Sequence, residues 1–564
     1  MKPTDINNPE YFHKVVDCQY ACPAHTPVPE YIRLIAAQRY TDAYMVNWES
    51  NLFPGILGRT CDRPCEPACR RVRVEDEPVA ICRLKRVAAD NKEDIAARLP
   101  LIPQQKNGRR IALIGAGPAS LTVARDLAPL GYELDVYDNQ FAGGGMMRSQ
   151  IPSFRLPESV LDEEVNYILQ RGVNAFFDIE VESLREILEK DYDAVFVGTG
   201  APRGKGLNLP GLEDARDHVH LGIDWLSSVA FEHTHAIGRR VLVLGGGNTA
   251  MDCCRTSRRL GGEDVRVVVR SPFEEMKASP WEKEDAMHEG IPIFNNHVPK
   301  EFVVDEGRLK GMTFEKVEAH YDEEGNRSLV PTGEDLVFME ADDVLIAIGQ
   351  ENTFPWIERD LGIAFDKWDM PVVDPVTFQS TNEKVFFGGD AAFGPENIIT
   401  AVAHGHQAAI SIDRLCQGEP VTERRLETKE FQRRFRSSVG FVFQDADIQC
   451  FSPTVRDELA FGPLQRGLPE EEIEVLVQEA LTALRIESIA DRYPYRLSGG
   501  EKKRVAIASV LTVDPEIYIL DEPTANLDPA TEGILIDLLA GFTGRGKTVV
   551  VATQDLTLAR HIGD

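Results

Sequence analysis

The chain has 564 residues, of which 43% are hydrophobic and 27% charged, and its formal net charge is −30. A chain of this length forms several domains, each large enough for its own core. The acidic balance argues against DNA or RNA as a partner, because phosphate binding needs a basic surface. No apolar run approaches the ~18 residues of a membrane span. The first residues lack a basic-then-apolar signal pattern, so we expect a cytoplasmic protein.

Six of the ten cysteines fall before residue 83. In a cytoplasmic chain such clustering indicates metal or cluster ligation rather than disulfides. Thiolates a few residues apart on short turns can converge on one iron–sulfur cluster. The alternative is a zinc site or scattered buried thiols. Pro23 directly after Cys22, and the lack of paired histidines, favour the cluster.

Two stretches of this region carry a family resemblance. CPAHTPVPEYIRL (22–34) and NLFPGILGRTCDRPCEPAC (51–69) resemble the N-terminal domain of the small (beta) subunit of bacterial glutamate synthase. The same module is similar to the N-terminal part of dihydropyrimidine dehydrogenase. That family carries two [4Fe–4S] clusters and has a further CxxC upstream of the position matching Cys18, which this sequence lacks. Six cysteines cannot supply eight thiolates, so we expect one cluster, with a second in doubt.

The resemblance also suggests which thiols bind the cluster. The best ligand candidates are Cys22, Cys61 and Cys65. The remaining position is open among Cys18, Cys69 and Cys82, any of which could instead join the ligands of a partner.

After a polar linker (99–108), the run RIALIGAGPASLTVARDLAPLGYELDVYD (110–138) reads as strand, glycine turn, helix, strand and acid. Glycines let the backbone approach a pyrophosphate at the helix N-terminus, and an acid ending the second strand takes a ribose hydroxyl. The pattern predicts a dinucleotide site, with a plain tight turn as the alternative. Ser120 replaces the usual third glycine, so we expect the helix to pack slightly further from the strand. The predicted site residues are Gly115, Gly117, Pro118, Ala119, Ser120 and Asp138.

The resemblance continues through GGGMMRSQIPSFRLP (143–157) and DAVFVGTGAPRG (193–204). In enzymes of this family the first of these stretches lies against the flavin. The resemblance therefore implies that Gly145 and Arg155 take part in binding FAD.

A second nucleotide turn lies in VLVLGGGNTAMDCCRTSRRLGGEDVRVVVR (241–270). Its second strand ends in an arginine, which suits a 2′-phosphate, where an acid would hold a free 2′-hydroxyl. This favours NADPH. NADH remains possible, because Ser271 stands where the family often has a second arginine. Cys253 and Cys254 lie inside the helix, where we expect packing. The predicted site residues are Gly245, Gly246, Gly247, Asn248, Thr249 and Arg270.

The run ADDVLIAIGQ (341–350) mirrors the earlier strand end, and we expect it to return the chain to the first dinucleotide domain. VFFGGDAAFGPENIITAVAHGHQAAISI (385–412) then reads as strand, GGD turn and long helix. The resemblance implies that Asp390, next to Gly389, contacts the ribityl–pyrophosphate part of the flavin. His404 and His406 lie on the helix, and we expect structural roles for them.

The expected fold class is α/β. An N-terminal helical iron–sulfur domain (1–100) precedes two interleaved Rossmann-like domains, one for FAD (108–225 and 340–418) and one for NAD(P)H (226–339). The resemblance covers residues 11–418. It implies an oxidoreductase that passes electrons from NADPH through FAD to a [4Fe–4S] cluster, and then to a partner such as a glutamate synthase-type large subunit. The same module serves other reductases, so the terminal acceptor stays open. We expect no catalytic side chain, because hydride transfer needs stacked, dry rings more than an acid or base.

Beyond Gly418 the sequence changes character. SVGFVFQDADIQCFSPTVRDELAFGP (438–463), LSGGEKKRVAIA (497–508) and IYILDEPTANLDPAT (517–531) are similar to an ABC-transporter ATPase of the energy-coupling-factor or cobalt-uptake type. We therefore expect a partial ABC-ATPase α/β segment over residues 425–564. The matching motif residues are Gln444 of the Q-loop, Asp521 and Glu522 of Walker B, and Asp528 of the D-loop.

Two features depart from an active ATPase. The switch histidine is replaced by Gln554, and the flavoprotein resemblance ends where the P-loop strand should begin. Residues 541–548 fit the P-loop expression. However, a helix precedes them and a strand follows, the reverse of what phosphate binding requires, so we predict a plain connection. Without a P-loop the ATP phosphates have no cradle, and we expect no ATP hydrolysis by this chain alone.

Several functions remain open for this segment. It is a degenerate interaction domain, it offers its LSGGE motif in trans to a complete ABC ATPase, or it is a gene-fusion or assembly accident with little function. For the whole chain, the rival function is an ABC-transporter-associated ATP-binding subunit with an appended redox domain. A scaffold with an inactive flavin fold is less favoured, because both glycine turns and the GGD strand are intact.

Overall fold

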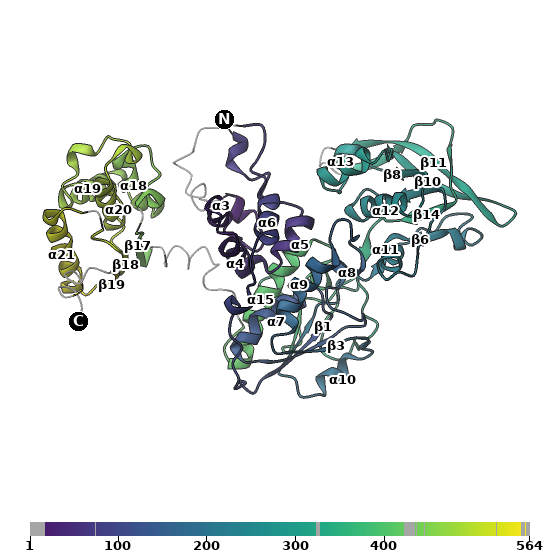
Figure 1. Ribbon diagram of the computed structural model, residues 1–564, viewed down its shortest axis with the longest axis horizontal. Helices are drawn as coiled ribbons and strands as arrows, with labels where there is room; N and C mark the ends of the chain where they lie inside the picture. The colour runs from purple at the N-terminus through teal and green to yellow at the C-terminus, as the bar shows by residue number, and fades with distance from the viewer. Residues whose placement is uncertain are drawn as a thin grey trace. The chain divides into compact units, whose positions relative to one another are not determined.

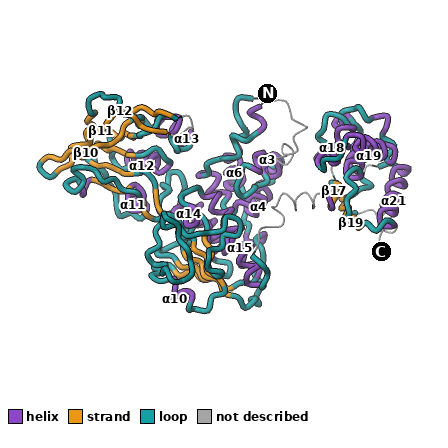
Figure 2. The backbone as a smooth tube through the Cα atoms, turned by 180° about the vertical axis from the view of Figure 1, so that it is seen from behind, coloured by secondary structure: helices purple, strands orange, loops and turns teal. Residues whose placement is uncertain are grey.

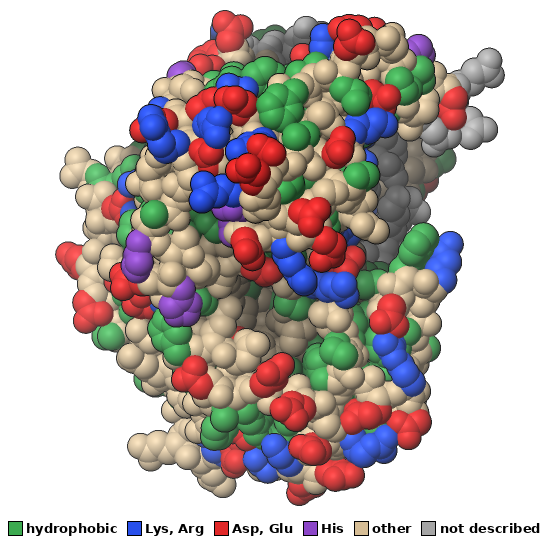
Figure 3. Space-filling model, turned by 90° about the vertical axis from the view of Figure 1, so that its right-hand side faces the viewer, with side chains coloured by type: hydrophobic (Ala, Val, Ile, Leu, Met, Phe, Trp, Pro, Cys, Tyr) green, Lys and Arg blue, Asp and Glu red, His purple; other side chains and the backbone are tan. Residues whose placement is uncertain are grey.

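The computed structural model describes residues 17–73, 75–322, 327–421, 435, 437–444, 446–525, 527–553 and 559. The chain divides into two compact units, Val16–Thr422 and Glu423–Asp564. No helix in these described ranges combines the length and apolar character of a membrane span. On the face shown in Figure 3, acidic and basic side chains are interspersed.

The cysteine-rich region folds into short helices joined by tight turns (Figure 1). Proline starts α5 at its first position, where no intrahelical N–H is lost. Helix α6 packs on α3, α4 and α5, and five of the six cysteines of this region are buried, whereas Cys18 is partly exposed. The elements are α2 (Asp17–Tyr20), α3 (Val28–Ala36), α4 (Tyr40–Asn51), α5 (Pro54–Thr60), η1 (Arg70–Arg73), α6 (Ile81–Asp90) and η2 (Ala96–Arg98).

The first dinucleotide domain is built on a five-stranded parallel sheet with strand order β16-β4-β1-β2-β3. Strand β4 is buried throughout, and so is β1 after its first residue, as expected for a sheet covered on both faces. Helices α7 and α15 pack against each other (Figure 1). The elements are β1 (Arg110–Ile114), α7 (Pro118–Leu127), η3 (Ala128–Leu130), β2 (Glu133–Tyr137), α8 (Met146–Ser149), α9 (Glu158–Leu169), β3 (Val173–Phe176), α10 (Leu184–Leu188), β4 (Ala194–Val197), β16 (Val385–Phe387), α14 (Asp390–Phe393) and α15 (Ile398–Gln417).

The second dinucleotide domain has its own five-stranded parallel sheet, in the order β6-β14-β7-β8-β9. The antiparallel strands β10 to β13 extend from it (Figure 2). Short strands β5 (Arg203–Gly204) and β15 (Gln350–Glu351) pair where the chain passes between the two domains. The remaining elements are η4 (Arg216–His218), β6 (Val219–Leu221), α11 (Gly222–Ala230), β7 (Arg240–Leu244), α12 (Asn248–Arg259), β8 (Asp264–Val268), η5 (Phe273–Glu275), α13 (Pro280–His288), β9 (Ile293–Phe294), β10 (His297–Asp305), β11 (Arg308–Tyr321), β12 (Arg327–Pro331), β13 (Val337–Glu340) and β14 (Asp343–Ile346).

The pairing of β14 corrects the expected domain boundaries. The sequence assigned residues up to 225 and from 340 onward to the first domain, yet β14 pairs with β6 and β7 of the second sheet. Strand β6 and helix α11 therefore also belong to the second domain. Strand β14 is a short apolar run, and either parallel sheet could bury such a run, so its partner depends on the tertiary fold.

The second unit contains a three-stranded parallel sheet in the order β17-β18-β19. Helix α20 starts with a capping box, in which Ser498 and Glu501 satisfy each other's backbone N–H groups. The elements are β17 (Val439–Val442), α17 (Ala446–Gln449), α18 (Val455–Gln465), α19 (Glu470–Ala483), η6 (Glu487–Ile489), η7 (Pro494–Arg496), α20 (Gly499–Leu511), β18 (Ile517–Asp521), α21 (Pro529–Gly544) and β19 (Thr548–Ala552).

Candidate functional site

A cavity of about 400 Å³ opens at the carboxyl ends of the first sheet. This is the edge where α/β folds bind nucleotides. Most of the residues that the sequence predicted for the first site line this cavity. They are Gly115, Gly117, Pro118, Ala119, Asp138, Gly145, Gly389 and Asp390.

Asp138 is held in this cavity by the glycine turn itself. Its carboxylate oxygens accept hydrogen bonds from the backbone N–H groups of Ala116 (2.6 Å) and Gln140 (2.8 Å). Burial raises the pKa of the carboxyl, and these two N–H groups oppose the shift. Because each oxygen uses one N–H donor, a lone pair on each remains for a ribose hydroxyl.

Ser120 does not line the cavity but is fully buried beneath it. Its hydroxyl has no hydrogen-bond partner among the described residues. It faces Gly198, directly after β4, where an added Cβ would lie 2.3 Å from Ser120 Oγ. The missing third glycine of the fingerprint is thus matched by a glycine on the facing strand end, which the sequence analysis did not identify.

Asp390 lines both the first cavity and a second one. Burial raises the pKa of its carboxyl to about 6, and a hydrogen bond from the Glu396 N–H opposes this shift. Two further polar atoms in the first cavity, Gln140 Oε1 and Thr199 Oγ1, are buried without a partner in the described part of the chain. Unsatisfied polar atoms of this kind fit a polar ligand.

The second cavity, also about 400 Å³, lies beside the glycine turn of the second sheet. Gly247, Asn248 and Thr249 line it, as does Lys277, which the sequence analysis missed. Gly245 and Gly246 instead make the turn, where a Cβ on Gly245 would lie 2.1 Å from the Ala347 carbonyl oxygen. The two cavities adjoin, because both are lined by Met146, Gln150, Gln350, Asp390, Asn397 and Ile398.

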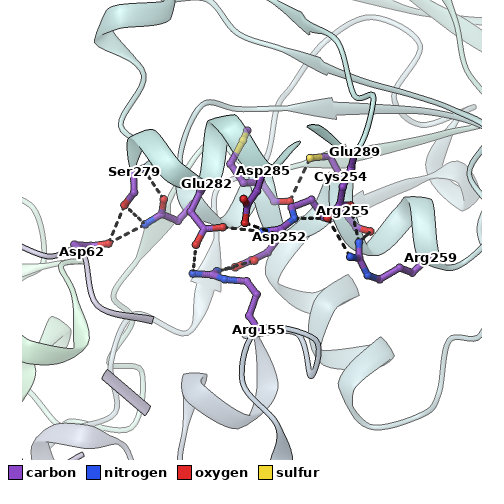
Figure 4. A network of polar contacts seen from close by, with 12 residues as sticks. Asp62, Arg155, Asp252, Cys254, Arg255, Arg259, Ser279, Glu282, Asp285 and Glu289 are labelled. Atoms are coloured by element: carbon purple, nitrogen blue, oxygen red, sulfur yellow. Dashed lines mark hydrogen bonds and ion pairs between the residues drawn. The ribbon is translucent and has the colours of Figure 1, made fainter. Parts of the chain in front are cut away.

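Arg155 lies at the second cavity rather than the first. Its guanidinium pairs with Asp252 of α12 and Glu282 of α13, each at 2.6 Å (Figure 4). Both carboxylates are buried, and burial raises the pKa of Asp252 to about 6 although Arg155 opposes the shift. Glu282 also pairs with Arg255 at 3.0 Å. The implied flavin ligand is therefore occupied in joining the two dinucleotide domains.

A second contact joins the cysteine-rich region to the nucleotide turn. Asp62 Oδ1 accepts hydrogen bonds from Asn248 Nδ2 (3.1 Å) and from the Ser279 hydroxyl (3.2 Å) (Figure 4). The Arg63 guanidinium stacks 4.0 Å above the ring of Trp281. The loop between Cys61 and Cys65 thus touches the first residue of α12.

By their electrostatic interactions the six N-terminal cysteines divide into two sets, although Cys65 packs in the same core as Cys18 and Cys69. The Cys82 thiol donates to the Leu57 carbonyl oxygen at 3.1 Å, and Cys61 Sγ accepts a hydrogen bond from the Arg63 N–H at 3.4 Å. The interaction between the two thiols raises the pKa of Cys61 and lowers that of Cys82. The buried Lys85 ammonium interacts electrostatically with Cys22, Cys61, Cys65 and Cys82, whereas Cys18 interacts with Cys69.

The first of these sets fits an iron–sulfur cluster by its chemistry, since four thiolates are the usual ligands of a [4Fe–4S] cluster. Burial is the main cause that raises the pKa of Cys65 to about 12, and the charge of Lys85 opposes it. In the described ranges, no three His, Cys, Asp or Glu side chains are placed to hold a single metal ion.

Comparison with known proteins finds a family match for each part of the chain. The family described as pyridine nucleotide-disulphide oxidoreductase matches residues 109–405. The chain belongs to this family. Residues 12–96 match dihydropyrimidine dehydrogenase domain II, 4Fe-4S cluster, and residues 397–525 match the ABC transporter family. The predicted resemblance to a flavoprotein with an iron–sulfur domain and a partial ABC segment is confirmed.

Three relatives illustrate the range of this family. The glutamate synthase [NADPH] small chain of Halomonas elongata is 31% identical over 416 residues, 70% of this chain and 87% of that one. The NADP(+)-dependent formate dehydrogenase subunit beta of Moorella thermoacetica is 32% identical over 475 residues, 79% of this chain and 66% of its own length. The NADPH-Fe(3+) oxidoreductase subunit beta of Geobacter sulfurreducens is 32% identical over 444 residues, which cover 73% of this chain and 66% of that protein. The chain spans just under two thirds of the length of the last two.

The family match implies that this chain binds FAD and NAD(P)H, and its N-terminal part matches a 4Fe-4S cluster domain. Its two conspicuous histidines have packing partners. His404 lies 4.7 Å from Phe378, between ring centroids, and burial lowers its pKa. His406 Nδ1 lies 2.5 Å from Asp126 of α7, and its Nε2 lies 2.9 Å from the Ser50 carbonyl oxygen of α4. Asp126 is an acid partner for His406 that the sequence did not reveal.

The two helix cysteines of this oxidoreductase are fully buried. The thiol of Cys253 contacts the Gly222 carbonyl oxygen at 3.7 Å, and that of Cys254 contacts the Met251 carbonyl oxygen at 3.2 Å. Both therefore pack within the second domain.

The second unit explains the apparent P-loop. Residues 541–548 span the end of α21 and the start of β19, which confirms the predicted helix-to-strand connection. Lys547 Nζ donates to the carbonyl oxygens of Asp514 (3.0 Å) and Pro515 (2.9 Å). The buried Lys503 of α20 donates to the backbone oxygens of Gln444 and Asp521 and so ties three ABC motifs together. Gln554 lies outside the described residues.

Proposed function

We propose that this protein oxidises NADPH at the second cavity and passes the electrons through FAD in the first cavity to one [4Fe–4S] cluster. The observation that carries this proposal is the shared lining of the two cavities. Asp390, Asn397 and Ile398 belong to both, so a nicotinamide in one cavity can meet a flavin ring in the other. Bound FAD supplies the conversion of a two-electron donor to one-electron transfer.

The residues of the first cavity act by position. Gly115 and Gly117 bring the start of α7 toward the pyrophosphate, whose charge the helix dipole favours. Asp138 is pre-oriented by its two backbone donors for the ribose hydroxyls. The N-terminus of the 20-residue helix α15 reaches the junction of the cavities, where its dipole favours negative charge on a bound ring system.

The residues of the second cavity bind the dinucleotide. Gly245 allows the close turn before α12, and Asn248 and Thr249 present the start of that helix to the pyrophosphate. The side chain of Asn248 is already held by Asp62 and by the Ser279 N–H, at 2.9 Å. Arg270, which follows β8 and is exposed, favours the 2′-phosphate of NADPH over NADH.

For the cluster we propose Cys22, Cys61, Cys65 and Cys82 as the four ligands. Their common neighbour Lys85 supports this set, since its positive charge offsets that of four thiolates. Cys18 and Cys69 form a separate pair with too few thiols for a second cluster. On this proposal Cys82 takes the fourth position, and Cys18 and Cys69 remain for a partner or a lost site.

We further propose that electrons leave to a partner subunit in the cytoplasm. A glutamate synthase-type large subunit is the first candidate, on the basis of the 87% coverage of that small chain. The described residues of the ABC-like segment form no phosphate cradle, so we assign it contacts with other proteins, for example with a complete ABC ATPase, rather than ATP hydrolysis.

An anaerobic visible spectrum with flavin and iron counts tests the proposal. We expect a yellow-brown protein with one flavin and about four irons per chain, whose flavin absorbance bleaches with NADPH. A colourless protein that hydrolyses ATP would instead support the alternative, an ABC-associated ATP-binding subunit.

A further inference from the structure

An arginine far along the chain reaches the residue that follows Arg270. Arg327, at the start of β12, donates from Nη1 to the Ser271 hydroxyl at 2.8 Å. The carbonyl oxygen of Ser271 accepts a hydrogen bond from Asn295 Nδ2 at 2.9 Å. Ser271 is therefore fixed through both its hydroxyl and its carbonyl group. Asn295 lies just beyond β9, and Arg327 belongs to the antiparallel sheet.

This location is the end of the second strand of the nucleotide fold. The residues there meet the 2′ position of the adenosine ribose, where an acid selects NADH and an arginine selects NADPH. Arg270 is exposed at this point, and Arg327 places a second guanidinium next to its neighbour Ser271. A planar guanidinium with several N–H donors suits a phosphate better than any other side chain.

The counter-ion of Arg327 is also part of this loop. Glu275 Oε2 lies 2.6 Å from Arg327 Nη1, and the two side chains are 33% and 28% exposed. A partly exposed ion pair of this kind is weak, so a dianionic phosphate can compete for the guanidinium. Glu275 holds the arginine near Ser271 and at the same time lowers its attraction for the ligand.

We propose that Arg327 and Ser271, together with Arg270, form the subsite for the 2′-phosphate of NADPH, and that Glu275 limits its affinity. This inference rests on the proposed function. It assigns NADPH specificity to a residue of β12 that no reading of the glycine-turn motif includes.

Anaerobic flavin bleaching with NADPH and with NADH tests the subsite through the apparent Kd of each. We expect Arg327→Ala to raise the Kd for NADPH by about tenfold or more, the weight of a charge-assisted hydrogen bond, with the Kd for NADH unchanged. Glu275→Gln should lower the Kd for NADPH alone. Arg308→Ala is the control, because Arg308 is an exposed arginine at the first residue of β11, whose backbone lies opposite Asp305 of β10 in the same antiparallel sheet.

Binding of adenosine 2′,5′-bisphosphate and of 5′-AMP, measured by calorimetry, provides a second readout without the flavin. We expect Arg327→Ala to weaken the binding of adenosine 2′,5′-bisphosphate and to leave the affinity for 5′-AMP unchanged. The proposed subsite is wrong if Arg327→Ala raises the Kd for NADPH and the Kd for NADH by the same factor, or if it changes neither. If neither dinucleotide bleaches the wild-type flavin, the proposed function fails, while the calorimetric comparison still decides the subsite.

Discussion

Replacing Gly198 by alanine tests how the helix of the first glycine turn is seated. The new Cβ would lie 2.3 Å from Ser120 Oγ and 3.0 Å from Phe196 Cε1, distances that force one group to move. Overpacking of a buried site costs about 1–3 kcal/mol. Because Ser120 lies in the first turn of α7, the displacement reaches the N-terminus that faces the cavity. We therefore expect Gly198→Ala to lower both stability and flavin retention.

A second substitution in the same chain isolates the cause. Ser120→Gly removes the serine side chain that the new Cβ would meet, while the contact with Phe196 remains. We expect partial rescue, with a coupling energy of roughly 0.5–3 kcal/mol between the two sites. Ser120→Ala is the control. It removes a buried hydroxyl without a partner in the described residues, so it should be neutral or stabilise by about 1 kcal/mol.

The four variants are Gly198→Ala, Ser120→Gly, Ser120→Ala, and Gly198→Ala combined with Ser120→Gly. Each variant and the wild type are unfolded thermally and followed by circular dichroism, and the flavin-to-protein ratio is measured after gel filtration. If the effects of Gly198→Ala and Ser120→Gly add to within about 0.5 kcal/mol, the limit for independent sites, the two residues do not compete for the same space. Loss of stability without any change in flavin retention would separate the packing of α7 from cofactor binding.

Two further predictions concern the cluster region. Cys82→Ser should abolish most of the iron content and the brown colour, whereas Cys69→Ser should keep about four irons per chain; equal losses would contradict the assignment of ligands. Glu164 accepts hydrogen bonds from the Gly55 and Ile56 N–H groups, and burial raises its pKa from 4.5 to about 7. The folded state thus binds more protons, so stability should fall by about 3 kcal/mol as pH rises from below 4.5 to above 7. Urea unfolding at pH 4 to 8 should show this slope in the Glu163→Gln control and not in Glu164→Gln.

The sequence alone was sufficient for the parts of this protein that depend on short stretches of chain. The two strand–glycine–helix turns, the GGD strand and the ABC motifs all lie where the local pattern predicts them. The reason is that a tight turn and a strand followed by a helix are set by neighbouring residues. The same local logic correctly rejected residues 541–548 as a P-loop, since the order of helix and strand can be read from periodicity.

The tertiary structure alone determines the contacts between segments that are distant in the chain. It paired Ser120 with Gly198, placed β14 in the second sheet, and directed Arg155 to Asp252 and Glu282. It also sorted the cysteines, because helix α6 brings Cys82 to Cys61 while Cys18 meets Cys69. Cysteine spacing limits which thiols lie on one turn, but it does not determine how helices pack. For that reason the proposed cluster ligands, the pairing of β14 and the contact of Arg327 with Ser271 follow only from the packing of segments far apart in the chain.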